Sequence, residues 1–250
     1  MNEIYNLHPP LAPTDRARAY LANQRKASLH PQPEPRRTLP GPAITVSRQS
    51  GTDALAVAER VAELLRAGQP GTAVPWTVFD RQLMERTLEE HNLPKVLAEF
   101  IPEDHRSVLR DLMDEMLGIV PPPWEIAPKL AETVLHLAYA GHVILVGRSA
   151  SLITARVPNV FQVRLVGSLA RRAERLRARK PMTEEEALKS LRADDRARAR
   201  YARANFQADV DDFLLYHLVI NTDTMPPEEA AQVIAGAAQR RFRALAASAS

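Results

Sequence analysis

The chain has 250 residues, of which 45% are hydrophobic, so it can bury the core of one large α/β domain. It contains no cysteine, which excludes disulfides and cysteine-bound zinc or iron–sulfur centres. No apolar run approaches the roughly 20 residues that span a bilayer, and the N-terminus lacks a signal-peptide pattern. These features predict a soluble, cytoplasmic protein without a membrane partner.

The net charge of +3 is unevenly distributed along the chain. Between Arg171 and Arg203 the sequence has twelve Lys or Arg against six Asp or Glu. Such a local excess of positive charge predicts an anionic partner, which could be a nucleotide, a nucleic acid or an acidic surface.

Residues 1–42 contain eight of the twenty prolines and are interpreted as an N-terminal arm. Within the arm, Thr14–Ser28 can form a short helix that Thr14 caps, with Ala17, Tyr20 and Leu21 on one side. The flanking segments are expected to be extended, and to be mobile unless they dock on the body or on a second subunit. A homo-oligomer formed through the arm is one such arrangement.

From residue 43 onward, short apolar segments alternate with amphipathic ones. The apolar segments predict strands at Ala43–Ser47, Trp76–Asp80, His142–Val146, Val160–Val166 and Leu218–Asn221. The helix after the first strand has an apolar stripe made of Leu55, Ala58, Val61, Ala62 and Leu65. Further helices are expected over Asp80–Met116, Lys129–Ala140, the arginine-rich region and Pro226–Ala246.

Short apolar strands separated by helices predict an α/β fold, with a central parallel five-stranded sheet covered by helices on both faces. Ligands of such sheets bind beyond the carboxyl ends of the strands. Polar residues gather at those predicted ends, in Ser47–Gly51, Asp80, Gly147–Arg148 and Asn221–Asp223.

The segment Ala43–Leu65 reads as a strand, a tight polar turn and a helix, a unit that holds phosphate on backbone N–H groups at the helix start. The turn contains Ser47, Arg48, Gln49, Ser50, Gly51 and Thr52. Gly51 permits the backbone turn, and Thr52 offers a hydroxyl to a phosphate or a metal. The alternative is an ordinary turn between a strand and a helix.

The turn departs from the P-loop pattern G-x-x-x-x-G-K-[ST], whose lysine reaches the phosphate oxygens. Arg48 stands at the first glycine, and Asp53, Ala54 and Leu55 stand at the last three positions. An acidic residue there would repel a phosphate. We expect Arg48 to supply the missing positive charge from the other end of the turn.

The chain from about Ala43 to Ile234 resembles the cytidylate kinase-like family of P-loop nucleoside monophosphate kinases, because several motifs occur in the same order. They are ITVSRQSG after the first strand, VFDRQL at Val78–Leu83, VILVGRSA at Val143–Ala150, PNVFQVRLVGSLARRAER at Pro158–Arg175, Asp195-x-x-Arg198-x-x-Tyr201, Asp209-Val-Asp-Asp212 and YHLVINT at Tyr216–Thr222. Each motif alone is weak, whereas their order and spacing together are fairly specific.

The resemblance implies a three-layer P-loop NTPase-type fold over residues 43–250, with a helical insertion that binds the monophosphate at about 81–127 and a lid at about 181–212. It places Arg148 on the acceptor phosphate, where the alternative is a surface arginine paired with a carboxylate. Asp80 either orients the acceptor or is structural. Asn221 and Thr222 would line the adenine pocket, and Mg²⁺ would accompany ATP.

The lid helix would carry Arg192, Arg196, Arg200 and Arg203 on one stripe, and Asp195 is spaced to pair with Arg198. In the lid, Arg192, Arg196 and Arg198 would stabilise charge on the transferring phosphoryl group. The alternative is a solvated helix with surface ion pairs. Asp209, Asp211 and Asp212 are interpreted as structural, and the seven histidines show no metal-ligand spacing, so no protein-held metal is predicted.

The leading hypothesis is therefore a nucleotide-binding enzyme that transfers the γ-phosphoryl group of ATP to CMP or dCMP. One alternative is a kinase-fold protein without catalysis, which senses nucleotides or binds a protein partner; Asp53, Ala54 and Leu55 favour it. A second alternative is a nucleic-acid-binding protein that uses the arginine-rich stretch. Aromatic residues make up only 5% of the chain, so base-stacking platforms are scarce.

Overall fold

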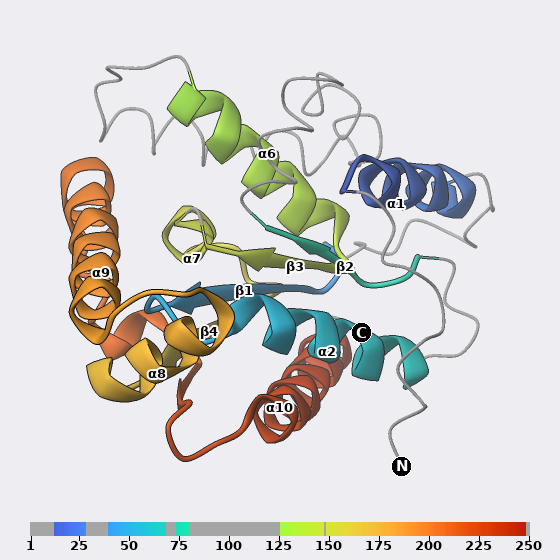
Figure 1. Ribbon diagram of the computed structural model, residues 1–250. Helices are drawn as coiled ribbons and strands as arrows, with labels where there is room; N and C mark the ends of the chain where they lie inside the picture. Colours follow the sequence, from blue (N-terminus) through green and yellow to red (C-terminus); the bar gives the residue numbers. More distant parts are fainter. Residues whose placement is uncertain (1–12, 29–39, 69–73, 81–125, 148, 249–250) are drawn as a thin grey trace, which may run out of the picture.

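Five short strands form one parallel sheet in the order β2-β3-β1-β4-β5 (Figure 1). The computed structural model describes residues 13–28, 40–68, 74–80, 126–147 and 149–248. The strands are β1 (Ala43–Arg48), β2 (Thr77–Phe79), β3 (Val143–Val146), β4 (Val160–Val166) and β5 (Leu218–Asn221). The central strand β1 pairs with β3 on one side and with β4 on the other. The predicted α/β fold with a parallel five-stranded sheet is confirmed.

Helices cover both faces of the sheet and give three layers (Figure 1). The helices α1 and α6 lie over one face, and α2 and α10 lie over the other, while α8 and α9 stand at one end of the sheet. The helices of the described chain are α1 (Pro13–Ser28), α2 (Ala54–Ala67), α6 (Ile126–Ala140), the short α7 (Ala150–Ile153), α8 (Leu169–Arg179), α9 (Glu184–Phe206) and α10 (Pro227–Ser248), with a 3-10 turn η1 at Phe213–Leu215.

The helix α2 forms because apolar residues recur every three or four positions and bury one stripe against the sheet and α10. The buried residues of the stripe are Ala54, Val57, Ala58, Val61, Ala62 and Leu65. The prediction was wrong for Leu55, which is 44% exposed. Position 55 lies at the margin of the stripe, and Val57 packs against the core in its place.

The two central strands carry four polar side chains on the same face. Thr45 pairs in register with Gln162, and Ser47 pairs with Arg164. Successive strand residues point to opposite faces, so these four side chains lie on the same face, and the apolar residues between them pack on the α2 side. We call Thr45, Ser47, Gln162 and Arg164 the polar column. It leads along the sheet to the carboxyl ends of β1 and β4.

The helix α1, from the predicted arm, docks on the body. Tyr20 is 1% exposed, donates a hydrogen bond to the carbonyl of Gly141 at 2.7 Å and meets the ring of Phe79 edge-on. Gln24 donates to the Tyr20 hydroxyl and to the carbonyl of Ala140. Burial raises the pKa of Tyr20 far above its ordinary value, so the hydroxyl keeps the proton that it donates. A homo-oligomer through the arm stays a prediction.

We expect Tyr20→Ala to lower the free energy of unfolding by about 3–5 kcal/mol, because it leaves a cavity beside Phe79. Tyr20→Phe should cost about 1–3 kcal/mol, because the Gly141 carbonyl then loses a buried partner. Urea unfolding followed by circular dichroism measures both. Equal stability of Tyr20→Ala and the natural chain would contradict the docking of α1.

Most predicted elements are present with bounds that differ by a few residues. The predicted helix over Lys129–Ala140 begins earlier, at Ile126, and the predicted helix over Pro226–Ala246 ends later, at Ser248. The short elements α7 and η1 were not predicted. The predicted helical segment Asp80–Met116 lies outside the described residues, except for Asp80 itself. Among the described helices, none has the length and apolarity to cross a bilayer.

Candidate functional site

A cavity of about 390 Å³ opens at the carboxyl ends of β1, β3 and β4. It lies beside the central strand, where the strand order reverses and α/β sheets hold their ligands. Its wall combines strand ends, α7, α9 and the segment before β5. The lining residues are Ser47, Arg48, Gln49, Gly147, Ser149, Ala150, Ser151, Leu152, Arg164, Asp195, Ala197, Arg198, Tyr201, Val210, Asp211 and Tyr216.

Arg48 and Gly147 both line this cavity and pack closely against each other. Gly147 follows β3 with φ +81°, a conformation that favours glycine. A Cβ atom at this position would lie 1.8 Å from Nη1 of Arg48, so the guanidinium occupies the space that any side chain would need. The absence of a side chain at position 147 therefore allows Arg48 to cross from β1 to the end of β3.

Arg164 lies on the sheet wall of the cavity, and its side chain is 6% exposed. Its Nη1 donates to Ser47 Oγ at 2.9 Å and to the Tyr216 hydroxyl at 3.4 Å, and its Nη2 pairs with Asp211 Oδ1. The guanidinium also lies 5.5 Å from the centre of the Tyr216 ring. A buried positive charge is thus held at the carboxyl end of β4.

The segment before β5 is held together by a hydrogen bond of its own and is fastened to β4 by further contacts besides those of Arg164. Tyr216 donates its hydroxyl hydrogen to the carbonyl of Val210, which closes the segment on itself. The Nδ1 atom of His217 accepts a hydrogen bond from the backbone N–H of Gln162, and the His217 ring stacks on the ring of Phe161. Burial lowers the pKa of His217, and the charge of Arg241 lowers it further. A neutral His217 matches its role as an acceptor.

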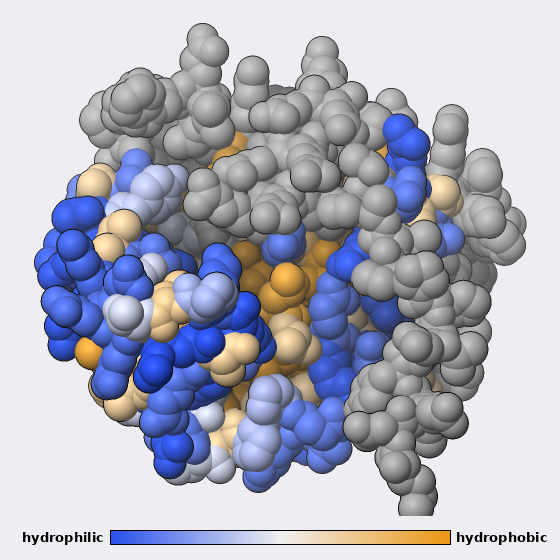
Figure 2. Space-filling view, viewed as in Figure 1, coloured by the Kyte–Doolittle hydropathy of each residue, from blue (hydrophilic) through white to orange (hydrophobic). Residues whose placement is uncertain are grey.

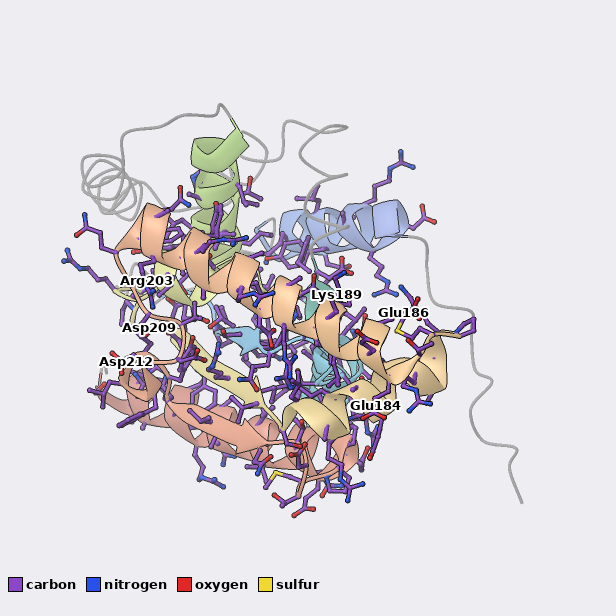
Figure 3. The ribbon with its side chains drawn as sticks, turned by 60° about the vertical axis from the view of Figure 1, so that its left-hand side comes forward. Glu184, Glu186, Lys189, Arg203, Asp209 and Asp212 are labelled. Atoms are coloured by element: carbon purple, nitrogen blue, oxygen red, sulfur yellow. The ribbon has the colours of Figure 1, made fainter. Side chains whose placement is uncertain are left out.

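The helix α9 supplies the wall opposite the sheet (Figure 3). It begins with a capping box between Thr183 and Glu186 and runs across the view to Arg203, beside Asp209. Asp195 and Arg198 of this helix both line the cavity, and their Oδ1 and Nη1 atoms lie 3.1 Å apart. The predicted pair of Asp195 with Arg198 is confirmed.

The turn after β1 is bound to α8 and α9 by a network of charged hydrogen bonds. The backbone N–H of Ser50 donates to Asp195 Oδ1 at 2.8 Å, and Nη1 of Arg172 donates to Asp195 Oδ2 at 2.6 Å and to the Ser50 carbonyl at 3.0 Å. The Ser50 hydroxyl donates to Asp194. The Asp195 carboxylate thus accepts from one backbone N–H and two arginines, which are donors of the kind that also bind phosphate groups.

The rest of the turn is closely packed. Gly51 has φ +79°, as its role in the turn requires, and a Cβ atom there would lie 3.0 Å from the Arg172 carbonyl oxygen. Thr52 is 1% exposed and donates its hydroxyl hydrogen to the Gln49 carbonyl. Asp53 pairs with Arg179 of α8 at 2.8 Å. This pair neutralises the acidic residue at the start of α2.

The comparisons with known proteins fit this geometry. The model of the cytidylate kinase-like family matches residues 43–224, which is most of the chain. The chain belongs to the cytidylate kinase-like family. A crystal structure of an uncharacterized protein from Eubacterium ventriosum superposes with a TM-score of 0.57 at 19% identity, and the match covers 80% of this chain and 98% of the other. This likeness supports the fold.

A crystal structure of a gluconokinase from Sinorhizobium meliloti gives a TM-score of 0.41 at 18% identity, over 83% of this chain and 97% of the other. No curated protein matches the chain. Membership of the cytidylate kinase-like family, together with the parallel sheet and the carboxyl-end cavity, identifies a nucleotide kinase-like protein with an α/β P-loop fold.

Some of the predicted site residues lie together in the structure, and others do not. The cavity wall includes Ser47, Arg48, Gln49, Asp195 and Arg198, which the sequence had placed in one site. The other predicted residues of the described chain do not line the cavity: Ser50, Gly51, Thr52, Asp80, Arg192, Arg196, Asn221 and Thr222. Arg192 and Arg196 are exposed on α9. Arg148 lies outside the described residues.

The residues after β5 form a separate network with α8. Thr222 donates its hydroxyl hydrogen to the Val166 carbonyl and accepts from Arg175, while Asp223 accepts from the Ser168 amide and from Arg175. Burial opposes ionisation of Asp223, but the hydrogen bonds from Ser168 and the charge of Arg175 outweigh it and lower its pKa. The assignment of Asn221 and Thr222 to the adenine pocket stays a prediction.

Sequence reasoning missed Arg164 and Tyr216, which line the cavity, and Arg172, which binds Ser50 and Asp195. A signal for Arg164 exists in the stretch VFQVRLV, where Gln162 and Arg164 alternate with apolar residues in a strand that is covered on both faces. Buried parallel strands are usually apolar throughout. Polar residues on one face of such a strand therefore indicate a lined cavity. Arg172 had no local signal, because its partners Ser50 and Asp195 are distant in sequence.

Six of the twelve basic residues between Arg171 and Arg203 form ion pairs with carboxylates. Ion pairs join Arg171 to Glu174, Arg172 to Asp195, Arg175 to Asp223, Arg179 to Asp53, Arg198 to Asp195 and Arg203 to Asp209. Figure 2 shows a hydrophilic surface over α8 and α9, at the left of the view. The pairs reduce the positive charge that this surface could offer to a polyanion, and no described contact favours the nucleic-acid alternative.

The three aspartates after α9 have the structural contacts expected of them. Asp212 accepts a hydrogen bond from the Leu214 amide and caps η1, Asp209 pairs with Arg203, and Asp211 pairs with Arg164. Figure 3 shows Asp209 and Asp212 beside the end of α9. Across the described parts of the chain, no cluster of three or more acidic or histidine side chains could hold a metal ion.

Proposed function

We propose that this protein transfers the γ-phosphoryl group of ATP to a cytidine monophosphate-type acceptor, CMP or dCMP. The observation that carries the proposal is the convergence of Arg48, Arg164 and Arg198 on one cavity at the carboxyl ends of β1 and β4. Phosphoryl transfer requires little covalent chemistry from the protein, so catalysis comes from positioning and from positive charge around the transferring group. The family match supports the same reaction.

In this proposal, the residues divide their roles by position. Arg48, from the turn after β1, and Arg198, from α9, approach the transferring phosphoryl group from opposite walls of the cavity. Arg198 is held in direction by Asp195, so it is pre-organised for the developing charge. Arg148 would hold the acceptor phosphate, as the family resemblance implies. Closure of α9 over the cavity would exclude water.

Mg²⁺ is proposed only as the companion of the ATP phosphates. The described residues do not provide a ligand set for it: the Thr52 hydroxyl is buried and donates to Gln49, while Asp195 and Asp211 are paired with arginines. These side chains do not fit a protein-held magnesium ion in this conformation. We therefore assign no catalytic step to the metal.

A coupled assay with ATP and a panel of CMP, dCMP, UMP and AMP tests the proposal. We expect turnover with the cytidine nucleotides, and we expect Arg198→Ala to lower kcat by about 100-fold or more, because it removes a charge that faces the transferring group. Arg177→Ala is the matched control, since Arg177 is an exposed arginine on α8. Equal kcat values for the two variants would contradict the role of Arg198.

A second function is favoured by one specific observation. The Ser50 amide already binds Asp195, and the Thr52 hydroxyl is buried, so the turn is occupied by groups of the protein itself. A nucleotide sensor or a partner-binding module without catalysis would keep such a turn. Calorimetric titration with ATP beside the coupled assay separates the two functions. ATP binding without turnover on any monophosphate would favour the sensor.

A further inference from the structure

Arg164 and Asp211 form an ion pair whose two members differ in burial. The Arg164 side chain is 6% exposed, whereas the Asp211 side chain is 64% exposed. Arg164 is anchored by the strand β4 and by hydrogen bonds to Ser47 and Tyr216. Asp211 belongs to an irregular turn between α9 and η1. Water can therefore hydrate the Asp211 carboxylate after it leaves, whereas the Arg164 guanidinium would stay buried.

Departure of Asp211 would leave a buried guanidinium without its counter-ion on the wall of a cavity. An unpaired buried charge is strongly unfavourable, and breaking such a pair from one side typically costs about 3–5 kcal/mol. Binding of another anion beside Arg164, in the place of the Asp211 carboxylate, is therefore favourable. An anion that enters from the cavity would find the planar fork of Arg164, which suits the oxygens of a phosphate or a carboxylate.

The remainder of the wall favours a doubly charged anion. Among the described residues, the cavity is lined by three arginines, Arg48, Arg164 and Arg198, and by two carboxylates, Asp195 and Asp211. Exchange of Asp211 for a ligand would leave three arginines and one carboxylate among the described lining residues. Ser149 also lines the cavity, and its side chain makes no capping bond to α7, so its hydroxyl can serve a ligand oxygen. Charge and donors together match a phosphate dianion.

We propose that Arg164 anchors an anion subsite for the phosphate of a phosphomonoester, and that Asp211 occupies the position of that phosphate when no ligand is bound. The inference rests on the proposed function in one respect, that the phosphomonoester is the acceptor nucleotide. It assigns a binding role to a residue of β4, in addition to the arginine that the family resemblance implies. It also couples ligand binding to release of the segment that follows α9.

Calorimetric titration with inorganic phosphate, CMP and cytidine tests the subsite without any turnover. We expect Asp211→Asn to bind phosphate and CMP about 3- to 10-fold more tightly than the natural chain, because the internal competitor has lost its charge. Arg164→Lys, which keeps the charge but lacks the fork, should bind both at least about 10-fold more weakly. Cytidine, which lacks the phosphate, should bind alike to all of these proteins.

Asp212→Asn is the matched control, because it removes the same charge from the same segment, and Asp212 caps η1 instead of contacting Arg164. Its phosphate affinity should equal that of the natural chain. If Asp211→Asn binds phosphate no more tightly than Asp212→Asn, the proposal is wrong and the ion pair only fastens the segment to β4. This comparison holds even if substitutions of the buried Arg164 impair folding.

The failure of this inference and the failure of the proposed function are distinguishable. Tighter phosphate binding by Asp211→Asn without turnover of CMP would support the subsite and contradict the proposed acceptor. Turnover of CMP with equal phosphate affinities in Asp211→Asn and Asp212→Asn would support the kinase function and overturn the subsite.

Discussion

Replacement of Gly147 by alanine is expected to lower both the stability of the protein and its affinity for phosphate ligands. The backbone at this position has φ +81°, which costs about 1–3 kcal/mol for a residue with a side chain. In addition, the new Cβ atom would lie 1.8 Å from Nη1 of Arg48. Arg48 is flexible enough to move, but it would then leave the cavity. We expect at least about a 10-fold loss of ATP and CMP affinity by calorimetry.

A double-mutant cycle separates the two effects of Gly147→Ala. In an Arg48→Ala background, no guanidinium occupies the space, so Gly147→Ala should cost only the backbone strain and should leave the ligand affinity of Arg48→Ala unchanged. Gly236→Ala is the matched control, because Gly236 lies within α10 and its Cβ would have Arg240 Nη1 as a neighbour at 3.6 Å. It should raise stability by about 0.5–1 kcal/mol. Additive affinity losses in the cycle would contradict the interlock of Arg48 with Gly147.

The fold was predictable because its signals are local. The strands Val160–Val166 and Leu218–Asn221 were predicted with their observed bounds, since each is a short segment rich in Val, Ile and Leu. The helix α7 was missed because one turn of helix has no measurable period. Leu55 was misplaced because the apolar period alone does not say where the stripe ends.

The site residues were predictable only where consecutive polar residues stand at the end of a predicted strand. Ser47, Arg48 and Gln49 follow that rule and line the cavity. The contacts that shape the site are between distant segments: Arg172 meets Ser50 and Asp195 only because α8 and α9 fold back over the turn. The arginines predicted to form one stripe do lie on a helix, α9. Their spacing alone, however, does not tell which face of the helix meets the sheet. Arg198 faces the cavity, whereas Arg192 and Arg196 are exposed.

Replacement of Asp195 by alanine is expected to destabilise the protein by about 3–5 kcal/mol in a low-phosphate buffer. Arg172, whose side chain is 6% exposed, would lose its counter-ion, and the Ser50 amide would lose its acceptor. The same loss creates a vacant anion position between the turn after β1 and α9. Pyrophosphate should therefore raise the Tm of Asp195→Ala more than that of the natural chain, because an added anion can replace the missing carboxylate. Thermal unfolding at matched ionic strength, in chloride and in pyrophosphate, measures both effects.

Asp194→Ala is the control for this rescue. Asp194 is exposed and accepts a hydrogen bond from the Ser50 hydroxyl, so its loss should change stability by no more than about 1 kcal/mol and should give no extra response to pyrophosphate. A larger response in Asp195→Ala would mean that the turn keeps its affinity for phosphate and that α9 competes for it with its own carboxylate. ATP would then have to displace Asp195 from Ser50, and the affinity for ATP would include the free energy of that exchange. Equal responses in the two variants would mean that the turn only joins β1 to α2, which favours the function without catalysis.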